Sequence, residues 1–182
     1  IYNRGELSVV SSTLSGNRAL DPSGQGAAGI ANLHQAPGSC GPVSFVGSTV
    51  TGNSTPGPRG GIWNGDGNCL FSLQNTIVAG NTSISAPETD DISGILVTFG
   101  GNLIGKKDEY YVGFPSDQVG TPSDPIDPLL GPLADNGGPT PTHALLAGSP
   151  AIGGGINVRF SAGTIRTEAD GALIVYATDV DG

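Results

Sequence analysis

The sequence predicts an all-β fold built from stacked repeats, and three observations lead to that prediction. Of the 182 residues, 31 are glycine and 14 are proline, while charged residues make up only 13%. The aliphatic residues come in short β-branched runs that alternate with Ser and Thr, which is the periodicity of a strand. One such run recurs along the chain. Because disordered chains combine high charge with few aliphatic residues, the glycine content here indicates turns rather than disorder.

The recurring unit is an eleven-residue segment that ends in Gly-Asn. Its first and third positions are apolar, its second is always Ser and its eighth is aliphatic; the copies are residues 7–17, 43–53 and 71–81. A shorter unit that begins with Ile and ends in Asn precedes each copy: residues 1–3, 30–32 and 62–64. A degenerate fourth copy spans residues 92–105. One unit cannot bury its own apolar face, so the units must stack, which predicts a parallel β-helix.

The alignment assigns positions within this stack. We expect two inward columns, formed by Ser12, Ser48 and Thr76 and by Leu14, Val50 and Val78. The Gly-Asn pairs are predicted to form tight structural turns, because Gly takes a positive φ angle and Asn tolerates it. The turn asparagines are Asn17, Asn53, Asn81 and Asn102. Loops of different length leave the same corner of each repeat.

The chain divides into three expected regions. Residues 1–105 form the β-helix rungs. Residues 106–153 form an irregular Pro/Gly-rich segment that packs on the helix, because prolines spread through residues 115–150 disfavour regular strands. Residues 154–182 form a β-strand extension or the start of a following module, with a β-hairpin-like region whose turn is 169–171. The chain opens at Ile1 without an initiator Met, which we interpret as an internal or processed fragment.

Two cysteines, Cys40 and Cys69, are predicted to form a disulfide between neighbouring rungs. The stack places them one residue out of register, and neighbouring strands lie about 4.8 Å apart. The alternative is a pair of buried free thiols.

No residue is assigned a catalytic role. Polysaccharide lyases and hydrolases need acids fixed on one strand face, and the three aligned copies contain no Asp, Glu, Lys or Arg. His143 is isolated and is expected to be a hydrogen-bonded structural residue, and His34 is expected to face solvent. No His, Cys and Asp cluster has the spacing of a zinc site.

No cofactor is assigned, but calcium is kept open because alternating oxygen ligands suit it. Asp179 and Asp181 are the preferred ligands. Two weaker candidates are Asn64-Gly-Asp66-Gly-Asn68, which is more simply a turn, and the cluster of Glu88, Asp90 and Asp91.

The net charge of −9 argues against nucleic acid as a partner. No apolar run approaches the roughly 18 residues that span a bilayer. Trp63, Tyr110 and Tyr111 are candidate partner contacts that can stack on sugars.

Residues 127–152 resemble the signature of bacterial choice-of-anchor Q domain proteins, and so do residues 99–105 and the Ser-Thr-Val-Thr-Gly-Asn rung. Through Gly60-Gly-Ile62 the chain is more weakly similar to polymorphic outer membrane protein repeats. The resemblance implies a secreted or surface-attached right-handed β-helix with no known reaction. The family continues Ser-Pro-Ala-Ile with Asp-Ala-Gly, whereas this chain has Gly153-Gly-Gly155. The last residues look like the edge of a cadherin-like module, in which Asp179-x-Asp181-Gly serves calcium.

These observations lead us to expect a non-catalytic structural or adhesive module, extracellular or at the cell surface, in a fibre or larger assembly. Its expected partners are neighbouring modules or further copies that meet the open end of the β-helix, where backbone groups are unpaired. Glycans and other surface proteins are further candidates. The alternative is a carbohydrate-binding or polysaccharide-degrading β-helix whose active groove lies outside this sequence.

Overall fold

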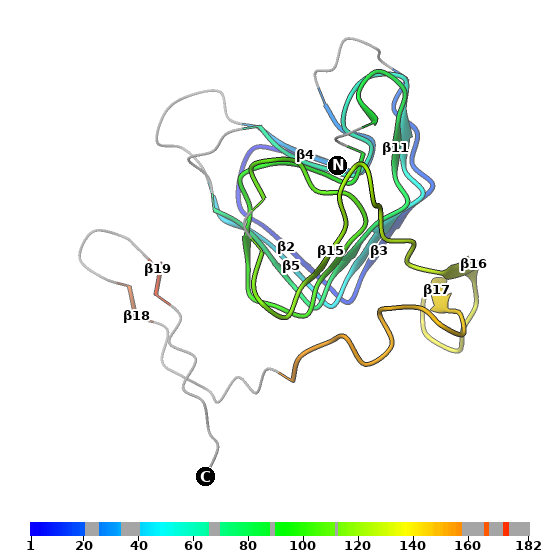
Figure 1. Cartoon of the computed structure of the whole chain (residues 1–182). Helices are drawn as coiled ribbons and strands as arrows, with labels where there is room; N and C mark the ends of the chain where they lie inside the picture. The colour runs from blue at the N-terminus through cyan, green and yellow to red at the C-terminus, as the bar shows by residue number, and fades with distance from the viewer. Residues whose placement is uncertain are drawn as a thin grey trace.

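The computed structural model describes residues 1–20, 26–33, 41–65, 70–87, 90–111 and 113–157, and the strand backbones at 166–167 and 173–174. This part of the chain is all β and contains no α-helix (Figure 1). Its strands are short, and most belong to parallel sheets in which neighbouring strands come from successive repeats.

Four parallel sheets contain strands from successive repeats. The first sheet holds β1 (Tyr2–Asn3), β4 (Ile30–Asn32), β8 (Ile62–Asn64) and β12 (Ile92–Gly94). The second holds β2 (Leu7–Val10), β5 (Val43–Val46), β9 (Phe71–Gln74) and β13 (Val97–Thr98). The third holds β3 (Thr13–Ser15), β6 (Thr49–Thr51), β10 (Ile77–Val78), β14 (Leu103–Ile104) and β15 (Gln118–Val119). The fourth pairs β7 (Ser54–Thr55) with β11 (Thr82–Ser83).

The register of these sheets matches the gapless sequence alignment. Ser8 lies opposite Ser44, which lies opposite Ser72. The degenerate fourth copy is also a full set of strands: β12 pairs with β8, β13 with β9 and β14 with β10. We call each set of strands that crosses the first three sheets a rung. The arrangement of parallel sheets is compatible with a parallel β-helix.

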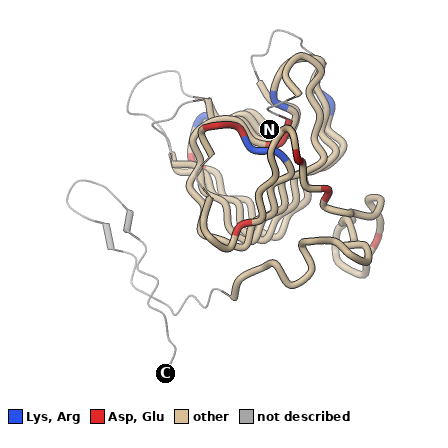
Figure 2. The backbone as a smooth tube through the Cα atoms, viewed as in Figure 1, with Lys and Arg blue, Asp and Glu red and all other residues tan. Residues whose placement is uncertain are grey.

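The core lies between the sheets. It is built from columns of aliphatic or aromatic side chains, each column taking one residue from the equivalent position of successive strands. Ile30, Ile62 and Ile92 stack in the first sheet, each with no exposed surface. In the second sheet the rings of Phe45 and Phe71 stack with centroids 5.6 Å apart and planes 11° from parallel. Full burial of one such side chain stabilises the fold by roughly 1.5–3 kcal/mol. Figure 2 shows that charged positions are sparse along these strands.

Residues 106–153 contain more regular structure than the prolines predict. β15 extends the third sheet beyond residue 105, because it pairs parallel with β14. β16 (Leu130–Ala134) and β17 (Thr142–Leu145) form an antiparallel pair whose register shifts between Leu130 and Leu133. Pro132 lies within that shift. A strand tolerates proline at such a bulge because no ladder N–H is needed there.

Hydrogen bonds tie residues 143–156 to the stack at three points. Asn75 Nδ2 donates to the carbonyl of Ile156 at 2.9 Å, and Gln118 Nε2 donates to the carbonyl of Pro150 at 2.7 Å. His143, on β17, is bonded to Ser15 Oγ on β3 at 2.7 Å. Farther along, β18 (Arg166–Thr167) and β19 (Leu173–Ile174) pair antiparallel on either side of the expected turn, whose residues 169–171 lie outside the described part.

Candidate functional site

A ladder of asparagine side chains runs through the Gly-Asn corners of the first three rungs. Asn17 Nδ2 donates to Asn53 Oδ1 at 2.8 Å, and Asn53 Nδ2 donates to Asn81 Oδ1 at 2.8 Å. The backbone N–H of each asparagine donates to the same oxygen, at 3.1 Å in both steps. The positive φ angles at these corners belong to the preceding glycines, which are Gly16, Gly52 and Gly80. The asparagines are therefore needed for hydrogen bonding and not for the turn conformation that the sequence suggested.

A second ladder runs through the column predicted from Ser12, Ser48 and Thr76. The backbone N–H of Ser12 donates to Ser48 Oγ at 3.2 Å, and that of Ser48 donates to Thr76 Oγ1 at 3.5 Å. Ser48 is 2% exposed and Thr76 is fully buried, which confirms their inward position.

Asn102 belongs to this second ladder and not to the corner column with which the sequence grouped it. Its Oδ1 accepts from the backbone N–H of Thr76 at 3.0 Å, in keeping with the register that places Leu103 opposite Ile77. The Gly-Asn dipeptide at 101–102 still follows a turn, because Gly100 and Gly101 both have positive φ angles. The fourth rung is shorter than the others, so a matching dipeptide falls at a different corner.

A third ladder, which was not predicted from the sequence, runs through the first sheet. Asn3 Nδ2 donates to Asn32 Oδ1, and Asn32 Nδ2 donates to Asn64 Oδ1, both at 2.9 Å. Asn64 Nδ2 then donates to the carbonyl of Ile95 at 2.7 Å. The signal was present, because the short unit before each repeat ends in Asn.

The first two ladders, at the Gly-Asn corners and in the Ser12 column, both end at an aspartate side chain. Asn81 donates to Asp91 Oδ1 from both its backbone N–H and its Nδ2, each at 2.9 Å. Asn102 donates to Asp117 Oδ1 from the same two groups, at 2.9 and 2.8 Å. In the first sheet, the edge N–H of Gly94 donates to Asp108 Oδ2 at 2.7 Å. We call Asp91, Asp108 and Asp117 the terminal carboxylates. An amide both accepts and donates, whereas a carboxylate only accepts and so ends the series.

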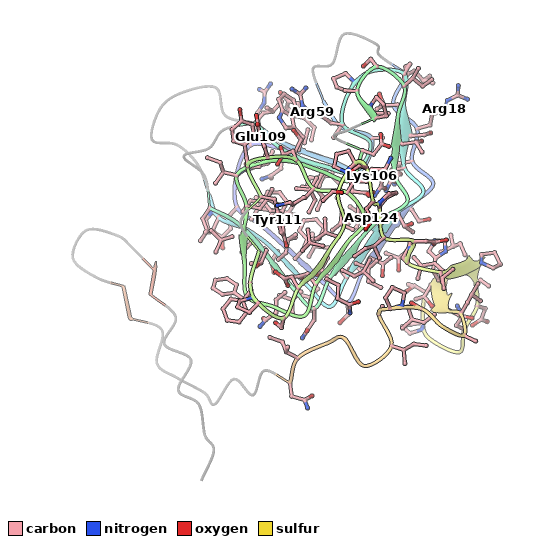
Figure 3. All side chains as sticks on the ribbon, in the orientation of Figure 1. Arg18, Arg59, Lys106, Glu109, Tyr111 and Asp124 are labelled. Atoms are coloured by element: carbon pink, nitrogen blue, oxygen red, sulfur yellow. The ribbon has the colours of Figure 1, made fainter. Side chains whose placement is uncertain are left out.

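Asp117 also holds the segment that folds over this end. Its Oδ2 accepts from Thr98 Oγ1 at 2.6 Å, from the backbone N–H of Phe114 at 2.7 Å and from Tyr111 Oη at 3.2 Å. Tyr111 is 4% exposed and joins the hydrophobic core cluster, which corrects its expected role as a partner contact. Figure 3 shows its side chain inside the ring of strands. Burial, together with the charge of Asp117, raises the pKa of Tyr111.

The other two candidate contacts differ from each other. Tyr110 is 58% exposed. Trp63 is half-buried, and the guanidinium of Arg59 lies over its ring, 3.8 Å from the centroid. One face of the indole is therefore already occupied by a cation–π contact.

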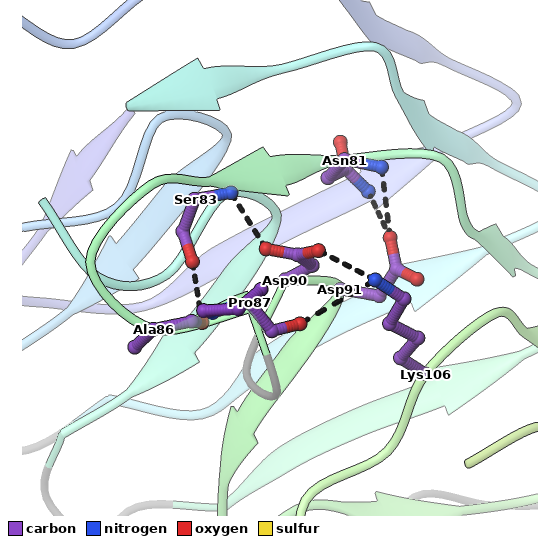
Figure 4. A network of polar contacts seen from close by, with 7 residues as sticks. All are labelled: Asn81, Ser83, Ala86, Pro87, Asp90, Asp91 and Lys106. Atoms are coloured by element: carbon purple, nitrogen blue, oxygen red, sulfur yellow. Dashed lines mark hydrogen bonds and ion pairs between the residues drawn. The ribbon is translucent and has the colours of Figure 1, made fainter. Parts of the chain in front are cut away.

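Asp90 and Asp91, two members of the acidic cluster considered for calcium, form part of the buried framework (Figure 4). Asp90 Oδ1 accepts from the backbone N–H of Ser83 at 2.6 Å, and its Oδ2 pairs with Lys106 Nζ at 2.7 Å. Burial raises the pKa of Asp91 to about 6, opposed by hydrogen bonds from Asn81 and from the backbone N–H of Lys106. Among the described residues, no three acidic, histidine or cysteine side chains gather closely enough to hold a metal ion.

His143 is hydrogen-bonded at both ring nitrogens, as expected for a structural histidine. Its Nε2 lies 2.7 Å from Ser15 Oγ, and its Nδ1 lies 2.7 Å from the carbonyl oxygen of Gly131. Several other predicted residues lie outside the described part of the chain: Cys40, Cys69, Asp179, Asp181, Asp66, Asn68, Glu88 and His34.

The opposite end of the stack has no comparable closure within the described residues. β1, β2 and β3 each have a sheet neighbour on one side only, and we call these three strands the first edge. The last edge is formed by β12, β13 and β15. At the first edge Ser12 Oγ donates to the carbonyl of Val10, and Asn17 Nδ2 donates along its ladder. Neither Ser12 Oγ nor Asn17 Oδ1 accepts a hydrogen bond from any residue that the structure describes.

Comparison with known proteins yields no match among family models, curated proteins or solved structures. The geometry is that of a stack whose last edge ends in carboxylates, whereas its first edge has no such closure among the described residues. The described residues also include no helix long and apolar enough to cross a membrane.

Proposed function

We propose that this chain is a non-catalytic structural or adhesive module of a secreted or cell-surface bacterial protein, folded as a right-handed parallel β-helix. Its place is in a larger assembly that it joins through the first edge. The observation that supports this most is the difference between the edges. One ends in carboxylates that accept the last donors, and the other has side-chain acceptors and backbone groups that no residue described in the structure pairs with.

The buried aspartates and the histidine that could serve as a general acid or base are already engaged in hydrogen bonds within the fold. Asp90, Asp91 and Asp117 all accept hydrogen bonds from backbone N–H groups. Both ring nitrogens of His143 have partners within the chain. A general acid or base must instead reach a substrate proton. This distribution favours a scaffold over an enzyme.

The resemblance to choice-of-anchor Q proteins fits this role and supplies the proposed handedness and location. Its signature at residues 127–152 contains β16 and β17. In this proposal the signature segment braces the third sheet through His143 and Gln118, while loops leaving the corners provide any specificity for partners.

The test combines an activity screen with a location assay. The purified chain is incubated with a panel of acidic polysaccharides and applied to a glycan array, while intact producing cells are treated with a membrane-impermeant amine label. We expect no cleavage product, no retained glycan, and labelling of the protein on intact cells. Cleavage or specific glycan retention would favour the carbohydrate alternative. Protection of the protein until the cells are broken would contradict the surface location.

A further inference from the structure

We infer that the ion pair between Asp90 and Lys106 is converted into a covalent amide, which joins the side-chain carboxyl group of Asp90 to Lys106 Nζ with release of water. Asp90 lies two residues before β12 and Lys106 lies two residues after β14. The bond is therefore an intramolecular cross-link that closes the fourth rung into a covalent ring. This inference goes beyond the proposed function and does not depend on it.

The two reacting groups are already in contact. Lys106 Nζ lies 2.7 Å from Asp90 Oδ2, and the two side chains are 25% and 5% exposed, respectively. Asp90 is held at two further points, because its Oδ1 accepts from the backbone N–H of Ser83 at 2.6 Å and its backbone carbonyl accepts from the N–H of Gly61 at 2.7 Å. Figure 4 shows the contact with Ser83 beside the ion pair. The carboxyl group is thus fixed where the amine reaches it.

The absence of a side chain at Gly105 lets the chain bring Lys106 to this position. A Cβ atom on Gly105 would lie 2.5 Å from Asp91 Oδ2 and 2.9 Å from the Cβ of Ala79. The backbone N–H of Gly105 also donates to the carbonyl of Val78 at 3.0 Å. The backbone that carries Lys106 is therefore packed against the third rung and fixed in place.

This arrangement favours condensation of the amine and the carboxyl group in two ways. Groups held in a fixed geometry within one molecule react at effective concentrations as high as about 10⁵ M. Burial penalises both charges of an ion pair, which lowers the cost of moving a proton from the ammonium to the carboxylate. The reacting forms, a neutral amine and a carboxylic acid, are for that reason easier to reach here than in water.

The reaction balances without an added reactant. One proton moves from Lys106 Nζ to Asp90 Oδ2. The Nζ lone pair then attacks Asp90 Cγ and forms the C–N bond, while the N–H of Ser83 stabilises the charge that develops on Oδ1. A second proton moves from Nζ to Oδ2, the C–Oδ2 bond breaks, and water leaves through an adjoining cavity of about 280 Å³, whose lining includes Asp90, Lys106 and Ile126. Ammonium and carboxylate become amide and water, and nothing is oxidised or reduced.

The test is the mass of the purified full chain, measured under denaturing conditions after reduction and alkylation of the cysteines. We expect most molecules of the folded wild type, incubated at neutral pH, to be lighter than their sequence by one water. Proteolysis and fragmentation should yield a branched peptide that joins Asp90 to Lys106. Lys106→Arg keeps the positive charge and should yield no branched peptide and no water loss, whereas the neighbouring Lys107→Arg should lose water as the wild type does.

A second measurement covers the case in which Lys106→Arg does not fold. Wild-type chain trapped in urea directly after cell-free translation should have its full mass and should lose water only after refolding, because the reaction needs the folded geometry. Full mass in the folded wild type, a water loss that maps within one linear peptide, or equal loss in urea would each overturn the inference. None of these results changes the outcome expected from surface labelling or from the polysaccharide screen, so the proposed function is tested separately.

Discussion

The first and last edges of the stack share one repeat but end it differently. At the last edge, Asp91 and Asp117 each accept two hydrogen bonds from the final asparagine of a ladder. At the first edge, Asn17 donates along its ladder and its own Oδ1 accepts nothing from the described residues. The difference shows that the bonds from one ladder asparagine to the next run one way, from an earlier rung to a later one. The Nδ2 groups of Asn53 and Asn81 also donate back to main-chain carbonyls of the preceding rung. An acceptor-only residue can close one end, and only a new donor can close the other.

The largest change in stability is expected when an interior ladder residue is replaced, compared with its counterpart at the first edge. Asn53 is fully buried, receives two hydrogen bonds and donates two to Asn81. Asn53→Leu leaves buried polar groups without partners on both sides and should lower the free energy of unfolding by about 4 kcal/mol. Asn17→Leu, at the exposed first rung, should cost about 1 kcal/mol. Urea denaturation measures both; equal losses would contradict the expected difference between the buried interior of the ladder and its first rung.

A pH dependence is expected from the closed edge. Burial raises the pKa of Asp91 to about 6, above its ordinary value of 3.8. The folded chain therefore binds more protons than the unfolded chain between these values, so this residue's contribution to stability is greatest below pH 4 and declines as the pH rises to 6. The change amounts to about 3 kcal/mol.

The measurement is the free energy of unfolding of the wild type and of Asp91→Asn at several pH values between 4 and 7. The difference between the two proteins removes the contribution of other titrating groups. Parallel curves would show that Asp91 does not titrate in this range. A difference that changes in the opposite direction would show that the hydrogen bonds from Asn81 outweigh burial.

Asp117→Asn tests whether the last edge needs a group that only accepts. Both oxygens of Asp117 receive hydrogen bonds, from Asn102 on one side and from Thr98, Phe114 and Tyr111 on the other. An amide would turn an NH₂ group toward one of these donor sets, so we expect a loss of about 2 kcal/mol in the free energy of unfolding. The exposed Asp124→Asn is the matched control and should change stability by less than about 0.5 kcal/mol.

The smallest change in stability is expected from a variant that distinguishes the contribution of the Tyr111 ring from that of its hydroxyl group. Tyr111→Phe keeps the buried ring and removes the hydrogen bond to Asp117, so the melting transition should shift by an amount equivalent to about 1 kcal/mol. Tyr110→Phe changes an exposed neighbour and should leave the transition unchanged within error. If the two variants behave alike, closure of the last edge depends on the packing of the ring alone.

Much of the stack was predictable because a parallel repeat carries its own register. The shared Ser at the second position and the aliphatic residue at the eighth aligned the three copies, and the strands pair in that register. The inward column of Ser48 and Thr76 followed from the same alignment. The position of Asn102 did not, because its Gly-Asn dipeptide matches the corner motif while the shortened fourth rung places it beside Thr76.

The sequence by itself determined the repeat, the all-β class and the inward columns, since periodic positions occupy equivalent environments. Only the tertiary structure decided how the stack ends. Asp91, Asp108, Tyr111 and Asp117 lie outside the aligned copies, and nothing in their spacing indicates what they contact. They act through contacts between segments distant in sequence, and an end has no neighbouring copy from which its partners can be inferred. For this reason the structure was needed to distinguish the edge closed by carboxylates from the edge that still offers acceptors.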